Sequence, residues 1–272
     1  LWAAEEVAKE LAVLGLRPGT RSSFGKRLEE YISEFQNTAN LLLKRNHQIA
    51  FIGSIGIGKS TAICRLTGLE ITEENGKKTP ILETGAGGTT ICEVSIQQGL
   101  NYGIRIEPCS DEEILSHVTE FAEYVLLDKN QEEDNDPEGN SSEGISKEIE
   151  RALRNMTGLK KQRTKGLDGK YTTTDEAKNI GKGLNSKREF VVELLNRMKI
   201  HSRDCRDIWY PNNIDKPASV WLKDTFKQIN NGRHENFTLP KKIEVIVRED
   251  IVKDSDLSIR IIDTKGINHT AV

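Results

Sequence analysis

The chain has 272 residues, with 42 Asp and Glu against 39 Lys and Arg, a net charge of −3 and a pI of about 6.1. This balance gives no general attraction to nucleic acid. No apolar run approaches the roughly 18 residues that are needed to span a bilayer. The first residues lack an initiator Met and a basic leader. We therefore interpret the chain as a fragment without a signal peptide, and expect it in the cytoplasm with reduced cysteines.

Two helices are expected in residues 1–46, before the first motif of the chain. Apolar residues recur at helical spacing over 1–14, and again from about Ser23 to Arg45. The turn-forming residues Arg17-Pro18-Gly19 separate the two runs. We interpret the second helix as packing on the domain that follows. The alternative is a lever that transmits the state of that domain.

The first motif is Gly-Ser-Ile-Gly-Ile-Gly-Lys-Ser at 53–60, which fits G-x-x-x-x-G-K-[ST]. The apolar run 48–52 before it predicts a buried strand, and 61–67 after it predicts a helix that ends near Gly68. A strand, a glycine-rich turn and a helix N-terminus together form an anion site, because backbone N–H groups and the helix dipole point at the ligand. Lys59 is predicted to contact the β- and γ-phosphates of a nucleotide, and the Ser60 hydroxyl to ligate Mg²⁺. The predicted nucleotide-binding residues of this motif are Gly53, Ser54, Ile55, Gly56, Ile57, Gly58, Lys59, Ser60 and Thr61.

The rest of the segment 47–109 is predicted to complete the first part of a nucleotide-binding core. The polar stretch 70–80 predicts a loop. Gly88-Thr89-Thr90 precedes an alternating strand over 91–96, and a second strand follows at 102–106 after a short turn. We expect these two strands to pair as a hairpin.

Residues 110–238 are predicted to form a helical insertion. Ser110 and Glu113 have the spacing of a capping box, and further helices are expected at 145–157, 189–200 and 220–229. The acidic stretch 128–144 predicts a linker. His201 and Cys205 lie four residues apart, but no second ligand pair accompanies them, so a zinc site is not favoured.

A basic stretch, 158–188, lies inside this insertion and carries nine Lys and Arg against three Asp and Glu. We interpret it as a solvated loop. The alternative is a surface that contacts phosphate, as nucleic acid would supply, or that binds a partner protein.

The second motif ends the last of two apolar strands, which are predicted at 242–247 and 257–262. It reads Asp263-Thr264-Lys265-Gly266, the pattern D-x-x-G. A nucleotide hydrolase needs such a sequence opposite its phosphate-binding turn. Asp263 would reach Mg²⁺ through water, and the Gly266 N–H would contact the γ-phosphate.

The three motifs resemble, in the same order, the first three motifs of the translation-factor-related P-loop GTPases. Gly88-Thr89-Thr90 resembles switch I of Era- and TrmE-like GTPases, and the long helix that enters the first strand resembles dynamin-like GTPases. The resemblance covers about 49–96 and 242–268. It implies that Thr90, or else Thr89, offers its hydroxyl to Mg²⁺ and the γ-phosphate, and that Asp263 and Gly266 form switch II. The implied catalytic residues are Lys59, Thr90, Asp263 and Gly266, and the implied metal ligands are Ser60, Thr90 and Asp263.

Three departures from the family stand out. Gly56 replaces the Asn of TrmE-like enzymes, and Ile267 stands where Ras-like proteins carry a water-orienting Gln. An apolar residue there implies that a partner protein, a second protomer or a backbone-held water completes catalysis. The guanine-reading motif [NT]-K-x-D cannot be assigned, so GTP is expected from the resemblance and ATP stays open.

These patterns predict an α/β fold: a P-loop NTPase three-layer sandwich with a mixed, mostly parallel sheet. N-terminal helices occupy 1–46, the core is split between 47–109 and 239–272, and the helical insertion separates its two parts. The expected function is a GTP-hydrolysing switch or assembly protein. One alternative is an ATPase, a motor or sensor module of a larger defence or DNA-processing protein. A second alternative is a nucleotide-binding scaffold that does not hydrolyse.

Overall fold

The computed structural model describes residues 6, 9–10, 18–43, 46–54, 56–73, 75–82, 91–127, 145–165, 171–211, 213–248, 251 and 258–264. Contacts divide the chain into two units, Leu1–His47 with Asp254–Ser258, and Gln48–Lys253 with Ile259–Val272. The first division falls one residue after the predicted end of the N-terminal helices. Most of the predicted helix 1–14 and all of the linker 128–144 lie outside the described residues.

The first unit contains the long helix α2, Pro18–Leu43. It begins five residues before the predicted Ser23, so the turn predicted at 17–19 is wrong over Pro18 and Gly19. Proline suits the first position of a helix, because the N–H that it lacks would have no partner there and its φ is already helical.

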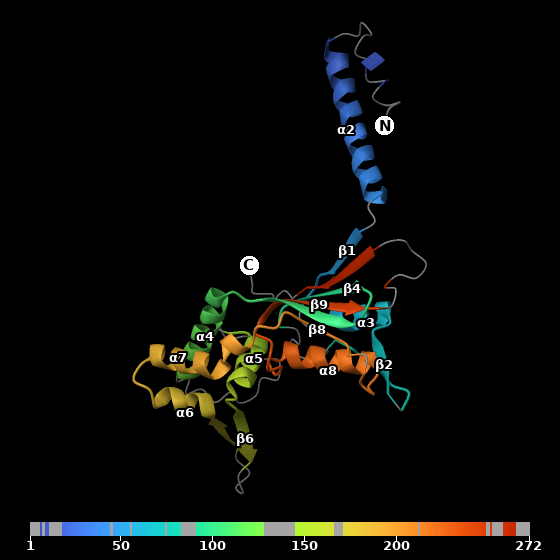
Figure 1. Ribbon diagram of the computed structural model, residues 1–272. Coiled ribbons are helices and arrows are strands. Elements are labelled where there is room, and N and C mark those ends of the chain that lie inside the picture. Colours follow the sequence, from blue (N-terminus) through green and yellow to red (C-terminus); the bar gives the residue numbers. More distant parts are fainter. Residues whose placement is uncertain are drawn as a thin grey trace. The chain divides into compact units, whose positions relative to one another are not determined.

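The second unit is built on a six-stranded mixed sheet with the order β1-β10-β4-β9-β5-β8 (Figure 1). Its strands are β1 Asn46–Phe51, β10 Ser258–Asp263, β4 Glu93–Gln98, β9 Pro240–Val247, β5 Gly103–Pro108 and β8 Asp207–Trp209. β4 and β9 are parallel, whereas the pairs β10–β4, β9–β5 and β5–β8 are antiparallel. The predicted α/β class and mixed sheet are confirmed, and antiparallel pairs outnumber the parallel one among these four registers.

The predicted hairpin of β4 and β5 is wrong, because β9 lies between them. Val245 of β9 is opposite Ile96 of β4 on one side and opposite Ile104 of β5 on the other. β9 is hydrogen bonded to a neighbouring strand along both of its edges, and Ile243 and Val245 are fully buried. The more apolar strand thus occupies the centre of the sheet, although it follows β5 by more than 130 residues.

The prediction of a buried strand before the glycine-rich turn is also wrong. β1 lies at an edge of the described sheet, with β10 as its one neighbour. Ile49 is 45% exposed and Ile52, just after the strand, is 71% exposed. An edge strand keeps one flank uncovered, which explains the exposure of these apolar side chains.

Two segments that were predicted as loops form two-stranded hairpins. β2, Glu70–Thr72, pairs with β3, Lys78–Pro80, around a turn at Gly76. β6, Lys161–Lys165, pairs with β7, Tyr171–Asp175, inside the basic stretch. Both hairpins are polar, so they lack the alternation of apolar residues by which strands are recognised in a sequence.

The described helices of the second unit agree well with the predicted ones, except that α6 lies in the basic stretch 158–188, which was predicted as a loop. They are α3 Lys59–Thr67, α4 Asp111–Leu126, α5 Lys147–Thr157, α6 Glu176–Lys182, α7 Lys187–Met198, α8 Ala218–Asn230 and the short 3-10 helix Ile200–Ser202. The Ser110–Glu113 capping box is present at the start of α4. α4, α5, α6 and α7 pack on one another, and α8 packs on β5. No described helix is long and apolar enough to cross a membrane.

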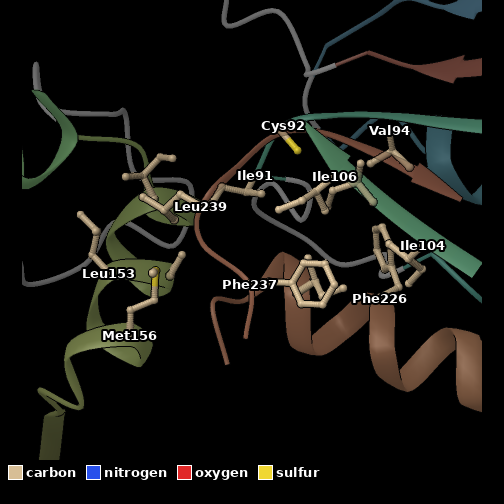
Figure 2. Close-up of a cluster of buried hydrophobic side chains, with 14 of the residues drawn as sticks. Ile91, Cys92, Val94, Ile104, Ile106, Leu153, Met156, Phe226, Phe237 and Leu239 are labelled. Carbon is tan, nitrogen blue, oxygen red and sulfur yellow. The ribbon is translucent and has the colours of Figure 1, made fainter. Parts of the chain in front are cut away.

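One apolar core joins the sheet to the helices. Figure 2 shows Val94 of β4 and Ile104 and Ile106 of β5 gathered with Phe226 of α8 and with side chains of α5. Leu153 and Phe237 are buried in the same cluster. The region predicted as a helical insertion therefore shares its core with the sheet, and it also supplies the edge strand β8.

Candidate functional site

The glycine-rich turn connects β1 to α3. Gly56 and Gly58 have φ angles of 78° and 94°, a left-handed conformation that glycine adopts without the strain a Cβ would bring. Gly58 is the N-cap of α3, and no described side chain caps it. The first amides of α3 are thus left for another acceptor, as in helices that bind anions.

Lys59 lies across this turn. Its Nζ donates hydrogen bonds to the carbonyl oxygens of Gly53, at 2.9 Å, and of Ser54, at 3.0 Å. The ammonium group has three N–H donors, and these two contacts leave the third for an anion. Lys59 therefore both fixes the shape of the turn and brings a positive charge to it.

The second motif lies directly beside the first. Ser60, the second residue of α3, donates a hydrogen bond from Oγ to Oδ2 of Asp263, the last residue of β10. Thr264 donates from both its backbone N and its Oγ1 to the carbonyl of Phe51, at 3.4 and 2.7 Å. The carboxyl ends of β1 and β10 thus lie side by side, so these neighbouring strands run in the same direction.

Asp263 is a buried carboxyl group, with 2% of its surface exposed. Burial raises its pKa, and the hydrogen bond from Ser60 and the charge of Lys59 only partly oppose this rise. Its second oxygen, Oδ1, is buried and has no hydrogen-bond partner among the described residues. A buried carboxylate oxygen without a partner is unfavourable unless a cation or a donor is bound to it.

These oxygens fit a hard divalent cation. Mg²⁺ prefers oxygen ligands and is commonly held by one or two protein groups, with water and substrate phosphate as its other ligands. Ser60 Oγ and Asp263 Oδ1 would be the protein groups that hold it, directly or through water. No cluster of three or more His, Cys, Asp or Glu that could hold a metal ion by itself occurs among the described residues.

Several predicted site residues cannot be compared with the structure. Ile55, Thr89, Thr90 and Gly266 lie outside the described residues, as does Ile267. Of the predicted residues that are described, the structure brings together Lys59, Ser60 and Asp263. Thr61 lies on α3 and is half-buried, and the backbone of Gly53, Ser54, Gly56, Ile57 and Gly58 forms the turn.

Asn230 was not singled out by its sequence context, although it binds the backbone of Ile91, the first described residue after Gly88-Thr89-Thr90. It is fully buried at the end of α8, and its Oδ1 accepts a hydrogen bond from the backbone N–H of Ile91 at 3.0 Å. The two residues are 139 positions apart. Asparagine at a helix end is common, so no local signal separates this one from an ordinary helix terminus.

No protein-family model matches the chain, and no curated protein shows significant similarity to it. Inferences about its function therefore rest on the geometry of its own residues.

Proposed function

We propose that the chain is a P-loop nucleoside triphosphatase of the GTPase type, whose phosphates bind at the glycine-rich turn. The observation that carries this proposal is the contact between Ser60 at the start of α3 and Asp263 at the end of β10. A helix-start hydroxyl beside a strand-end carboxylate is the pair that a nucleotide hydrolase uses around Mg²⁺. The two residues belong to different motifs, so their contact is not a consequence of local sequence.

The residues of the site would have distinct roles. The amides of the turn and of the first residues of α3 would bind the phosphates, and Lys59 would neutralise charge that develops on the γ-phosphate. Ser60 and Asp263 would hold Mg²⁺, which, when bound, supplies further neutralisation of the phosphate oxygens. The reaction would be in-line attack of water on the γ-phosphate. Thr89 or Thr90 and Gly266 are proposed as the switch residues of this site.

The order of strands in the sheet supports the GTPase type. β10, which carries Asp263, lies next to β1, and on its other side it pairs antiparallel with β4, the strand that follows Gly88-Thr89-Thr90. The three strands that precede, carry or follow the motifs, β1, β10 and β4, are therefore neighbours in the sheet. The family resemblance and a three-layer sandwich are compatible with this arrangement, and they remain part of the proposal.

A titration of the nucleotide site tests the proposal. Isothermal calorimetry with Mg²⁺ and a slowly hydrolysed analogue of GTP or of ATP measures both affinities on the same protein. We expect binding of the GTP analogue, abolished by Lys59→Ala and kept by Lys77→Ala, which removes an exposed lysine from the β2–β3 turn. Binding of the ATP analogue alone would replace the GTPase by the ATPase alternative. Binding of neither would reject the nucleotide site.

We expect slow hydrolysis by the chain alone, because Ile267 stands where Ras-like GTPases carry the Gln that orients the attacking water. Because Ile267 cannot orient water, a protein partner or self-association is proposed to complete catalysis. A rate of phosphate release per protein molecule that rises with protein concentration would support self-association. A rate per molecule that stays constant over the same range would favour a partner of another kind.

A further inference from the structure

A cavity lies beside α5, outside the proposed nucleotide site, and its lining is strongly basic. Its volume is about 490 Å³. Among the described residues that line it, five are cationic and one is acidic. The cationic residues are Lys147, Arg151, Arg154, Lys160 and Lys161, and the acidic residue is Glu150.

The helix spacing explains why the charges converge. Lys147, Arg151 and Arg154 are at positions i, i+4 and i+7 of α5, so they share one face of the helix. The opposite face, with Ile149 and Leu153, is buried in the core. α5 ends at Gly158, whose φ of 74° turns the chain back toward β6.

The one acidic residue in the described lining, Glu150, does not offset the other cations. Glu150 accepts a hydrogen bond from Arg154 Nε at 2.7 Å, and Arg154 also binds Asp175 through both carboxylate oxygens. The carboxylate of Glu150 is thus already engaged by one of the five cations. Lys147, Lys160 and Lys161 have no ion pair with a described residue, so their charges are available to a ligand.

The basic character continues along β6 beyond the cavity. Lys161 and Lys165 are four positions apart on this strand, on the same face and at a spacing of about 13 Å. The segment 145–165 contains seven Lys and Arg against two Glu, although the whole chain has a net charge of −3. The hairpin formed by β6 and β7 extends away from the helices α5, α6 and α7 (Figure 1).

We propose that the cavity beside α5 and the strand β6 form a binding surface for the phosphate backbone of nucleic acid. A small anion would need only the cavity, whereas the cations continue in a line along β6, as a linear polyanion requires. A membrane surface is less suitable, because interfacial segments add exposed apolar anchors. None of the large exposed apolar residues of the described chain falls within 145–165.

Fluorescence anisotropy tests the surface with the full chain and a labelled duplex of about 20 base pairs that has 5′-hydroxyl ends. We expect a Kd of about 1–100 μM at physiological salt, and a tighter one at lower salt. Lys160→Gln with Lys161→Gln should weaken binding and reduce the slope of log Kd against log salt by about 2, one for each phosphate contact. Lys147→Gln, on another element, should reduce it by about 1.

A matched control separates this surface from general charge effects. Lys77→Gln with Lys78→Gln removes the same two charges from two adjacent lysines of the other hairpin, β2–β3, and should leave the Kd and the slope unchanged. Lys59→Ala should also bind the duplex normally, which separates this surface from the proposed nucleotide site. Thermal unfolding of each variant establishes that it is folded.

Four results would overturn the proposal. The first is absence of duplex binding at about 50 mM salt, and the second is an equal effect of the control pair. The third is binding to vesicles of phosphatidylserine and phosphatidylcholine in place of the duplex. The fourth is displacement of the duplex by inorganic triphosphate at equal phosphate concentration, which would indicate a site for a small anion.

Discussion

Ser60 and Asp263 are hydrogen bonded although 203 positions separate them in the chain. Ser60 belongs to the start of α3 and Asp263 to the end of β10, and both elements meet at one edge of the sheet. The contact leaves Oδ1 of a buried carboxyl group without a partner among the described residues. When this carboxyl group is ionised, its buried charge is unfavourable, and a bound cation would relieve it.

This burial gives the first prediction, which concerns the pH dependence of stability in Asp263→Asn. The folded pKa of Asp263 is above the unfolded one, mainly because of burial. Its contribution to stability is therefore complete below the unfolded pKa and is lost as pH rises through the folded pKa. Asn does not titrate. The free energy of unfolding of the variant, minus that of the wild type, should therefore increase as pH rises.

Urea denaturation at a series of pH values without Mg²⁺ measures this difference. The difference, variant minus wild type, should stop increasing above the folded pKa of Asp263. Mg²⁺ with a nucleotide should then stabilise the wild type more than the variant. A difference that decreases with rising pH would mean that the surroundings stabilise the carboxylate, which would contradict the expectation from its burial.

The second prediction concerns Lys59→Met, which removes the ammonium group and keeps an apolar stem. Lys59 is expected to lower the energy of the transition state through its charge, so phosphate release should slow by about 10²–10³-fold. The variant also loses two hydrogen bonds to the turn, at Gly53 and Ser54. Lys77→Met is the control, and a similar slowing in both variants would remove Lys59 from the mechanism.

The third prediction concerns Asn230→Ala at the end of α8. The substitution leaves the Ile91 N–H buried without its acceptor, which should lower the free energy of unfolding by about 1–3 kcal/mol. Asn185→Ala is the control, because Asn185 is exposed and its amide is 3.5 Å from its neighbour Glu189. Urea denaturation compares the two, and equal losses would show that the buried hydrogen bond is not the cause.

The sequence predicts the local features of this fold better than the pairing of its strands. The end of α3 at Gly68 and the capping box at Ser110 depend on neighbouring residues, and both are present as predicted. The position of β9 between β4 and β5 depends on contacts across more than 130 residues, which no local pattern encodes. The polar hairpin of β2 and β3 was missed because periodicity identifies a strand only when one of its faces is apolar.

The candidate site follows the same division. The turn around Gly58 and the helix that begins at Lys59 follow from the first motif alone. The meeting of Ser60 with Asp263 was expected only through the order of motifs in a family, because nothing near either residue specifies the other. Asn230 has neither a motif nor a periodic pattern, so only the folded chain identifies its contact with Ile91.

The last prediction concerns Arg154, which joins α5 to the start of α6. Arg154 donates to both carboxylate oxygens of Asp175, at 2.9 and 2.8 Å, and lies over the ring of Phe121. Burial acts to raise the pKa of Asp175, but the hydrogen bonds and the charge of Arg154 outweigh it, so the pKa is lowered. This contribution to stability is present above the unfolded pKa and is lost as pH falls through the folded pKa.

Arg154→Ala should therefore lower the free energy of unfolding by about 2–4 kcal/mol at neutral pH, because it leaves Asp175 largely buried without its cation. The loss should shrink in acid, where Asp175 becomes protonated in the variant. Arg197→Ala is the control: its pair with Glu193 has a similar length, 2.6 Å, but both side chains are more than one third exposed, so its loss should stay below about 1 kcal/mol. Urea denaturation of both variants across the acid range measures the difference. A loss at Arg154 that does not change with pH would assign its effect to packing on Phe121 and not to the ion pair with Asp175.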